Sequence, residues 1–383
     1  MPTPIPYGRQ SINDTDLQAV AAVLRSPFLT QGPAAEAFES AVALRVGAGY
    51  ALATTNATAA LHLACLALGL GPGDRLWTSP ITFVASANVG LMCGAEVDFV
   101  DIDPLTYNLS VTALEAKLQA AQAQQRLPKI VMPVHLCGQP CDMAAIGRLS
   151  RQYGFRVIED ASHAIGARDQ GAPVGSCTWS DITVFSFHPV KIITTGEGGM
   201  ALTNDPTLAD RMRRLRSHGL QYTEAGQAFR ADGEIWNYTQ EDLGFNYRMT
   251  DLQAALGLSQ LQRLDTFLAR RQTLAARYDS LLQNLAIQRP HQLAGTESSY
   301  HLYPIGVDRQ QAVYQGLRDL GIMCNLHYIP VYLQPFYARM GFRRGLCPNA
   351  ETYFKRCISL PLHAELTNSE QDFIVDALQK VLT

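Results

Sequence analysis

Residues 182–200, ITVFSFHPVKIITTGEGGM, join an apolar run, a cluster of polar residues and a glycine-rich turn. The apolar residues at the start of this segment predict a buried β-strand that ends at Phe187. Ser186, His188 and Lys191 stand at the end of that strand. The three glycines of TGEGG allow another part of the backbone to approach closely. We therefore expect this segment to hold a lysine in a buried, glycine-flanked site.

Six further apolar runs occur between about residues 49 and 204. They alternate with helical stretches that carry start signals, such as Asp142 alone, or Thr112 with Glu115 three residues later. This alternation is typical of an α/β fold in which helices cover both faces of a largely parallel sheet. The seven predicted strands begin at Tyr50, Arg75, Glu96, Lys129, Arg156, Ile182 and Gly199.

The C-terminal third predicts a second, smaller domain. A capping box of Thr250 and Gln253 opens a long helix, which continues at three- to four-residue apolar steps to Leu282. We expect residues 1–250 to form a large domain that includes an N-terminal segment contacting the substrate. Residues 251–383 are expected to form an α+β domain led by the long helix.

Within the small domain, the pattern predicts strands at 300–307, 322–328 and 358–363. A helix is expected to end at about Leu320, because Gly321 follows it, and Thr367 with Glu370 opens the last helix. The polar stretch from Gln221 to Glu241 contains glycine and predicts the most flexible loop.

The composition narrows the class of partner. The chain has 383 residues, of which 47% are apolar, so it can form large buried cores. Its 31 basic and 34 acidic residues give a net charge of −3, which offers no basic surface for nucleic acid or anionic lipid. The start of the chain lacks the pattern of a signal peptide, and no apolar stretch reaches eighteen residues, so we expect a cytoplasmic protein outside the membrane.

Lys191 differs from the other four lysines in its surroundings. Lys117, Lys355 and Lys380 fall on predicted helices and Lys129 precedes a strand, where a solvated amine is ordinary. Lys191 is flanked by valine and isoleucine at the exit of a strand. Loss of water around its amine would lower the pKa and favour the neutral nucleophile that Schiff-base chemistry needs. The alternative is a lysine at a domain edge that extends its amine to solvent.

Two other segments could complete a site with Lys191. RVIEDASHAIGA, residues 156–167, places Asp160 at the carboxyl end of a strand, where open α/β folds build their sites. Asp160 could face a cationic ring nitrogen, or could simply cap the next segment. TTNATAALHLACLAL, residues 54–68, predicts a helix whose first N–H groups could bind a phosphate. A plain buried helix is the alternative.

An amine, a carboxylate and a phosphate cradle together match the needs of pyridoxal 5'-phosphate (PLP). Phe83 would supply an aromatic face for the cofactor ring, although a core phenylalanine is the simpler interpretation of that residue alone. Nucleotide-binding motifs are missing, since no G-x-G-x-x-G follows a strand and no Gly-Lys pair could form a P-loop. His135, Cys137 and Cys141 lack a second ligand pair at zinc-finger spacing, so we expect no metal site.

At these motifs the chain resembles the DegT/StrS family of PLP-dependent sugar aminotransferases, which have the aspartate-aminotransferase fold (fold type I). The resemblance covers nearly the whole chain. It rests on LTQGP at 29, NATAAL at 56, PITFVASAN at 80, VHLCGQPCDM at 134, IEDASHAIGA at 158, FSFHPVKIITTGEGG at 185, RSHG at 216, GFNYRM at 244 and HYIPVY at 327. Within the family, the chain is most similar to the PseC branch, which aminates C4 of a UDP-linked 4-keto-6-deoxy-N-acetyl-altrosamine on the way to pseudaminic acid.

The resemblance implies roles for individual residues. Lys191 and Asp160 match the catalytic Schiff-base lysine and the partner of the ring nitrogen. Asn246 matches an asparagine that reaches the phosphate from the neighbouring subunit, which implies a homodimer. The remaining cofactor contacts would be Ala57, Thr58, Phe83, His163 and Ser186, and the sugar-nucleotide contacts would be Tyr7, Leu29, Thr30, Asn325, His327 and Tyr328.

The resemblance also implies the reaction. L-Glutamate would give its amino group to the C4 ketone of a UDP-linked 4-keto-6-deoxy-N-acetylhexosamine. One alternative is another nucleotide-linked keto sugar, such as a dTDP-hexose or a UDP-pentose, because a few pocket contacts decide specificity. Some members of the family are sugar 3-dehydratases, in which a histidine replaces the Schiff-base lysine. The presence of Lys191 disfavours that function here. The other alternative is a non-catalytic, PLP-binding regulatory protein.

Overall fold

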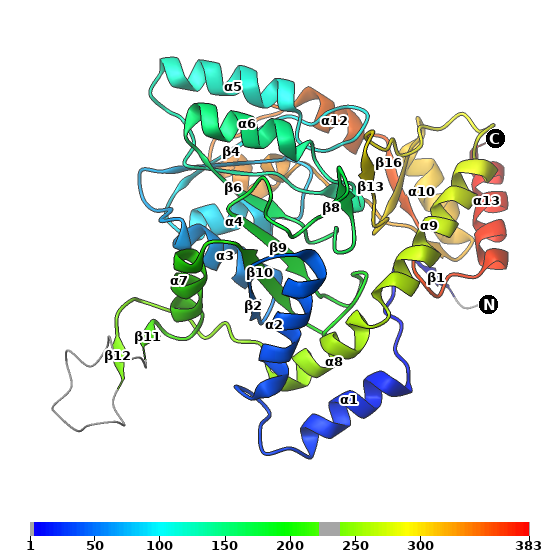
Figure 1. The fold of residues 1–383 in the computed structure, drawn as a ribbon. Coiled ribbons are helices and arrows are strands. Elements are labelled where there is room, and N and C mark those ends of the chain that lie inside the picture. The colour runs from blue at the N-terminus through cyan, green and yellow to red at the C-terminus, as the bar shows by residue number, and fades with distance from the viewer. Residues whose placement is uncertain (1–3, 222–237, 383) are drawn as a thin grey trace, which may run out of the picture.

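The computed structural model describes residues 4–221 and 238–382, so the loop predicted between Gln221 and Glu241 lies mostly outside the described residues. Its largest feature is a seven-stranded sheet with the strand order β2-β10-β9-β6-β5-β3-β4 (Figure 1). The strands are β2 (Tyr50–Thr54), β3 (Arg75–Thr78), β4 (Glu96–Phe99), β5 (Ile130–Met132), β6 (Arg156–Asp160), β9 (Ile182–Ser186) and β10 (Gly199–Thr203). All seven predicted strands are confirmed.

The sheet is mostly parallel, as the alternation of strands and helices predicts. β6 pairs in parallel with both β5 and β9, and β3 pairs in parallel with both β4 and β5. Only β10 runs antiparallel to its neighbours β2 and β9 within this sheet. The carboxyl ends of β2, β6 and β9 therefore meet at one edge, next to the first residue of β10.

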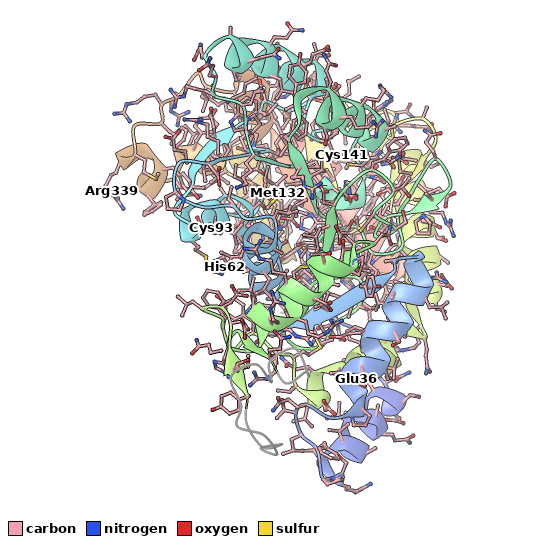
Figure 2. All side chains as sticks on the ribbon, turned by 60° about the vertical axis from the view of Figure 1, so that its left-hand side comes forward. Glu36, His62, Cys93, Met132, Cys141 and Arg339 are labelled. Carbon is pink, nitrogen blue, oxygen red and sulfur yellow. The ribbon has the colours of Figure 1, made fainter. Side chains whose placement is uncertain are left out.

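Helices cover both faces of the sheet. Ile158 points to the face covered by α3 (Ala57–Ala67), α4 (Ala85–Met92) and α7 (Pro206–Arg216), whereas its neighbour Val157 points to α5 (Val111–Ala123) and α6 (Met143–Tyr153). Figure 2 shows Met132 of β5 in the interior and Glu36 of α2 (Pro33–Val46) at the periphery. Both faces of the strands are apolar, which explains the nearly continuous hydrophobic runs in the sequence.

The N-caps predicted at Asp142 and Thr112 can be compared with those in the structure. Asp142 caps α6 by accepting a hydrogen bond from the N–H of Ala145, as predicted. The predicted start at Thr112 is wrong by two residues, because Ser110 caps α5 through the N–H of Ala113. Serine and threonine are both good N-caps, so the sequence signal alone did not separate the two positions.

The C-terminal part forms a smaller α+β unit with its own core. β14 (Tyr303–Gly306) pairs antiparallel with β16 (Cys357–Leu360), and α9 (Leu264–Leu281), α10 (Gln310–Asp319) and α13 (Asn368–Leu382) contribute to the same hydrophobic cluster. The N-terminal strand β1 (Ile5–Pro6) joins this unit by pairing with β15 (Ile322–Met323). The capping box of Thr367 and Glu370 is present.

The single long helix predicted from Thr250 to Leu282 is wrong, because the chain forms two helices, α8 (Asp251–Leu261) and α9. The first of them begins with the expected capping box of Thr250 and Gln253. At Arg263 the backbone N–H bonds to the carbonyl of Gln260, three residues back, and the Arg263 side chain contacts Asp16. Figure 1 shows the change of direction between α8 and α9.

The remaining elements are short, except for the first, which has 11 residues. They are α1 (Asp14–Leu24), η1 (Leu136–Gly138), β7 (Arg168–Asp169), β8 (Ala172–Pro173), β11 (Leu220–Gln221), β12 (Thr239–Gln240), β13 (Thr296–Glu297), η3 (Val331–Leu333), α11 (Pro335–Arg339) and α12 (Pro348–Phe354). None of the helices in the described residues is both long and apolar enough to cross a membrane.

Candidate active site

A cavity of about 850 Å³ opens at the carboxyl edge of the large sheet. This volume is in the range of ordinary ligand sites. Eleven of the fourteen predicted site residues line it: Tyr7, Ala57, Thr58, Phe83, Asp160, His163, Ser186, Lys191, Asn325, His327 and Tyr328. The fold thus brings together residues from both ends of the chain.

Lys191 lies in the loop between β9 and β10 and lines the cavity. Its backbone N–H bonds to the carbonyl of His188, which closes a turn directly after the strand. Burial of the amine lowers the pKa of Lys191 to about 8, and attraction by the Asp160 carboxylate opposes this shift. An amine with this pKa is still mostly protonated at pH 7 but is half unprotonated near pH 8, so it offers far more neutral nucleophile or base than an ordinary lysine.

Asp160 is the last residue of β6, and its carboxylate is held from two sides. Ser86 of α4 donates to Oδ2 at 2.6 Å, while the hydroxyl and the backbone N–H of Ser162 donate to Oδ1 at 2.6 and 3.1 Å. These hydrogen bonds fix the orientation of the Asp160 carboxylate on the wall of the cavity.

The amino end of α3 forms another wall. Asn56 caps the helix through the N–H of Ala59, and helix geometry leaves the N–H groups of Ala57 and Thr58 without intrahelical partners. Gly199 of β10 packs directly against this turn, since a Cβ at that position would lie 2.5 Å from the backbone N of Ala57. The glycine-rich segment of the sequence therefore serves the close approach of β10 to the helix end.

Aromatic and imidazole side chains surround the space between Lys191 and α3. Phe83 is 60% exposed, and its ring centroid lies 6.5 Å from that of Tyr328. His163 is buried, and its Nε2 lies 3.3 Å from the Tyr328 hydroxyl. Burial, followed by repulsion from Lys191, holds the pKa of His163 well below its usual value. A neutral imidazole and two aromatic rings can accept a flat aromatic ligand.

The far side of the cavity is built by the segment after β1 and by the smaller unit. The Tyr7 ring lies 5.1 Å from His327, and the backbone carbonyl of Tyr7 accepts a hydrogen bond from Leu362. His327 shares a hydrogen bond with Ser359 at 2.8 Å, and burial lowers its pKa to about 3. Asn325 lines the same wall. These groups are neutral hydrogen-bonding partners.

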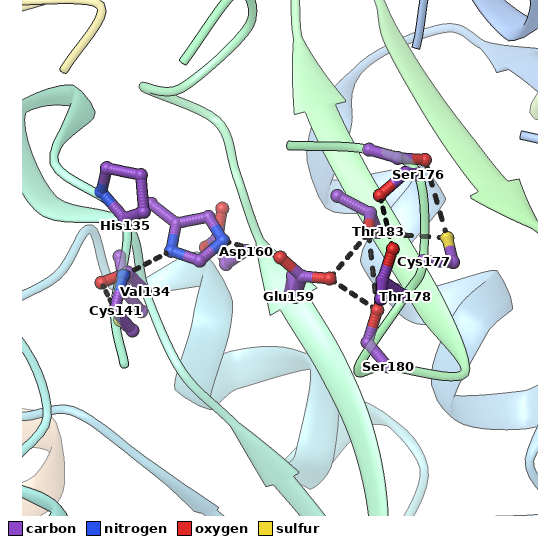
Figure 3. Close-up of polar contacts among 12 residues, drawn as sticks. Val134, His135, Cys141, Glu159, Asp160, Ser176, Cys177, Thr178, Ser180 and Thr183 are labelled. Atoms are coloured by element: carbon purple, nitrogen blue, oxygen red, sulfur yellow. Dashed lines mark hydrogen bonds and ion pairs between the residues drawn. The ribbon is translucent and has the colours of Figure 1, made fainter. Parts of the chain in front are cut away.

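A buried polar network lies behind Asp160 on the other face of β6. Glu159 accepts hydrogen bonds from His135 at 2.7 Å, from Thr183 at 3.0 Å and from Ser180 (Figure 3). The Nδ1 atom of His135 in turn accepts the backbone N–H of Cys141 at 3.0 Å. Burial raises the pKa of Glu159, but these hydrogen bonds outweigh it and hold the pKa below its ordinary value. The network fixes the end of the strand that carries Asp160.

Three predicted contacts do not line the cavity of their own chain. Leu29 and Thr30 lie beside the start of α8, where Asp251 donates its N–H to the carbonyl of Leu29 and Thr30 forms a bridge with Thr250. Asn246 is exposed, whereas its neighbour Tyr247 lines the cavity. Successive side chains of an extended segment point in opposite directions, so Asn246 faces away from the cavity of its own chain.

Several residues that line or support the cavity were not predicted. Thr82, Ser162, Glu197 and Tyr247 line it, and Ser86 holds Asp160. Ser162 could have been suspected, because a serine two residues after an aspartate often donates back to it. His188, whose function the sequence left open, also lines the cavity. The backbone of Arg248 forms an antiparallel β-bridge with that of Thr54 at the end of β2.

The described residues contain no group of three or more His, Cys, Asp or Glu side chains that could hold a metal ion. Cys137 and Cys141 are buried with free thiols, and the thiol of Cys141 donates to the carbonyl of Val134. His135 uses both ring nitrogens in the network behind Asp160. Cys141 and His135 therefore have other partners.

Comparison with known proteins identifies the family of this chain. The family model described as "DegT/DnrJ/EryC1/StrS aminotransferase family" matches residues 10–379. The chain is 38% identical to the spore coat polysaccharide biosynthesis protein SpsC of Bacillus subtilis (strain 168) over 387 residues, covering 99% of this chain and 97% of SpsC.

The similar solved structures are also sugar aminotransferases. Helicobacter pylori PseC, an aminotransferase involved in the biosynthesis of pseudoaminic acid, has a TM-score of 0.91 and 29% identity, with 99% of both chains covered. The PLP form of Spr1654 from Streptococcus pneumoniae has a TM-score of 0.88 and 30% identity, covering 99% of this chain and 100% of that one. The protein therefore belongs to the DegT/DnrJ/EryC1/StrS family and is a sugar aminotransferase of fold type I.

Proposed function

We propose that this protein is a PLP-dependent nucleotide-sugar transaminase that uses L-glutamate as the amino donor. The acceptor would be the C4 ketone of a UDP-linked 4-keto-6-deoxy-N-acetylhexosamine. The observation that carries the proposal is the amine of Lys191 in a cavity that also holds the Asp160 carboxylate and the amino end of α3.

The cavity fits the polar parts of PLP. Lys191 offers a neutral amine for the aldehyde, and the hydrogen-bonded carboxylate of Asp160 offers a partner for the ring nitrogen. Ala57 and Thr58 at the start of α3, together with Ser186, offer donors for the phosphate. Phe83 and His163 would border the ring.

When bound, PLP would carry the amino group from the donor to the sugar and would take up electrons in its protonated ring. Lys191 would act as the base that moves a proton from Cα of glutamate to C4' of the cofactor. In the second half-reaction it would move a proton from C4' to C4 of the sugar. A base of this kind is typically worth about 10²–10⁴ in rate. Asp160 would favour the protonated ring nitrogen by its negative charge.

The sugar would occupy the side of the cavity formed by Tyr7, Asn325, His327 and Tyr328. Hydroxyl, amide and neutral imidazole groups suit the hydroxyl and acetamido groups of a sugar, because each can donate or accept a hydrogen bond. The choice of a UDP-linked N-acetylhexosamine is supported by the likeness to PseC. A dTDP-hexose or a UDP-pentose remains the alternative acceptor.

A homodimer would complete each site. Asn246 is exposed and faces away from the cavity of its own chain, which supports a contact with the PLP phosphate of the partner. Leu29 and Thr30 contact Asp251 and Thr250, which follow Asn246 closely in the chain. Leu29 and Thr30 would therefore enter the partner's site together with Asn246. This arrangement accounts for the three predicted contacts that lie outside the cavity.

A donor and acceptor screen tests the proposal. Purified protein is incubated with L-glutamate and a panel of UDP- and dTDP-linked 4-keto sugars, and the products are identified by mass spectrometry and NMR. We expect a 4-amino sugar from the UDP-linked 4-keto-6-deoxy-N-acetylhexosamine, and none when glutamate is omitted. Preferred amination of a dTDP-hexose or UDP-pentose would support the alternative acceptor. Binding of PLP without turnover of any sugar would support a regulatory protein.

A further inference from the structure

The hydrogen bonds around His163 fix the position of its ring proton. The backbone N–H of Cys137 donates to Nδ1 of His163 at 3.2 Å. A backbone amide can only donate, so Nδ1 must carry a lone pair and no proton. The imidazole is therefore neutral, with its proton on Nε2. The large lowering of the His163 pKa by burial and by the charge of Lys191 agrees with this state.

The proton on Nε2 sets the direction of the next hydrogen bond. Nε2 lies 3.3 Å from the hydroxyl oxygen of Tyr328, so His163 donates and Tyr328 accepts. The hydroxyl proton of Tyr328 is then free to be donated into the cavity that both side chains line. Burial raises the pKa of Tyr328, which keeps this proton on the phenol.

The amide of Cys137 reaches His163 because of an unusual turn. Cys137 adopts a φ of 61°, a left-handed conformation that residues with side chains rarely adopt. Next to it, Gly138 has a φ of 95°, and a Cβ there would lie 2.4 Å from Oγ of Ser299. Strained backbone at a site persists only where the surrounding structure holds it.

Asn108 holds this turn through three side-chain hydrogen bonds. Its Oδ1 accepts the N–H of Leu136 at 2.9 Å, and its Nδ2 donates to the carbonyls of Gln139 and Pro140 at 2.9 and 3.1 Å. The side chain is buried, with only 3% of its surface exposed. Asn108 thus bridges the residues on both sides of Cys137 and does not line the cavity.

We infer that Asn108 is a positioning residue for the proposed transamination, and that it acts through the Leu136–Gly138 turn to hold His163 in the Nε2–H tautomer. The Nδ1–H tautomer would place a lone pair opposite Tyr328 and reverse the direction of donation. A protonated His163 would add positive charge beside Lys191 and the ring of the cofactor. The tautomer is a property of the protein itself, whereas its effect on the rate rests on the proposed function.

The direct test reads the ring nitrogens of His163 by NMR. Full-length protein labelled with ¹⁵N-histidine is examined by long-range ¹H–¹⁵N correlation between pH 6 and 8, and His163→Gln assigns the signal. We expect an unprotonated Nδ1 and a protonated Nε2, unchanged over this range. A protonated Nδ1 in the native protein would overturn the inference, and this result does not depend on which sugar is aminated.

Asn108→Ala tests the positioning role, with Asn284→Ala at an exposed turn as the matched control. In Asn108→Ala we expect a mixture of His163 tautomers and a kcat lower by about ten- to hundredfold, the size of a small misplacement of a catalytic group. KM for glutamate should change little. A single unchanged tautomer with full kcat would contradict the role of Asn108.

A second pair of variants does not depend on how well Asn108→Ala folds. Gln at position 163 keeps an acceptor for the Cys137 N–H and a donor toward Tyr328, whereas Phe keeps neither. We expect His163→Gln to retain most of kcat and His163→Phe to lose at least about tenfold more. Equal activity of the two variants would show that the fixed proton has no function.

Discussion

At the scale of single residues, burial gives Lys191 its chemical character. Lys117 and Lys129 pair with the carboxylates of Asp98 and Asp74 at the protein surface. Lys191 instead lines a cavity beside Asp160, and its pKa falls to about 8. Chain composition pointed to this residue, because only five lysines are present and four have ordinary settings.

The lowered pKa of Lys191 predicts how the rate of PLP capture depends on pH. Only the unprotonated amine attacks the aldehyde, so the rate should rise with pH through a midpoint near 8. Stopped-flow absorbance of cofactor-free protein mixed with PLP measures this rate, with Nα-acetyl-lysine as the reference amine. A midpoint near 10.5, the ordinary value for lysine, would show that the cavity does not shift the amine.

Replacement of Asp160 by Asn tests the proposed pairing of this carboxylate with the ring nitrogen of PLP. The variant keeps the shape of the side chain but cannot stabilise a protonated ring nitrogen, so kcat should fall about a hundredfold or more. Circular dichroism should show an unchanged fold. Asp319→Asn, on the exposed end of α10, is the control for loss of a surface carboxylate. Unchanged kinetics in Asp160→Asn would remove its proposed role.

Sequence reasoning reached Lys191 and Asp160 but missed Ser86, which holds Asp160 at 2.6 Å. Lys191 and Asp160 each follow or end a recognisable apolar strand, so their position at the sheet edge follows from the pattern of strands. Ser86 lies 74 residues before Asp160, and only the packing of α4 against the sheet brings the two together. Contacts of this kind depend on the tertiary structure and leave no local signal.

At the scale of elements, the seven strands were predictable because each is a short apolar run between helices or turns. The break between α8 and α9 could not be predicted, because the three- to four-residue spacing of apolar residues continues through Gln262 and Arg263. The break accompanies contacts of Arg263 with Asp16 and the carbonyl of Ser11, far away in sequence. Periodicity describes which face is buried and not whether the helix axis is continuous.

The contact between β10 and α3 predicts the effect of Gly199→Ala. A Cβ at position 199 would lie 2.5 Å from the backbone of Ala57, so the amino end of α3 must shift. We expect the free energy of unfolding to fall by about 1–3 kcal/mol, typical of overpacking, and PLP to bind more weakly. Urea unfolding and fluorescence titration with PLP measure these two effects.

Gly71→Ala is the matched control, because no atom would lie within 4 Å of a Cβ added at Gly71. This substitution should leave both the stability and the PLP affinity close to those of the native protein. If Gly199→Ala bound PLP with native affinity, the close packing of β10 on α3 would not be needed for the phosphate site.

At the scale of the whole molecule, a site that spans two chains predicts complementation. In a dimer of one Lys191→Ala chain and one Asn246→Ala chain, one of the two sites has an intact lysine and an intact partner asparagine. Random mixing should therefore restore up to about one quarter of native activity, given half heterodimers with one good site each. The mixture is made by co-refolding or co-expression and assayed for amination.

Each variant measured alone should have little activity. If the mixture is no more active than the separate variants, Asn246 serves the site of its own chain, and the arrangement of the dimer proposed above is wrong. The net charge of −3 gives the molecule no overall positive field, so the nucleotide sugar proposed above would be bound by local hydrogen-bond donors.

Lys191 is proposed above to carry the chemistry of a PLP-dependent sugar transaminase. The most direct test of this role is the visible absorption band and the glutamate-dependent amination of Lys191→Ala, compared with Lys355→Ala at an exposed helix end. We predict that Lys191→Ala loses both the band of the Schiff base and all amination, while Lys355→Ala keeps both. Full amination by Lys191→Ala would show that Lys191 does not carry this chemistry.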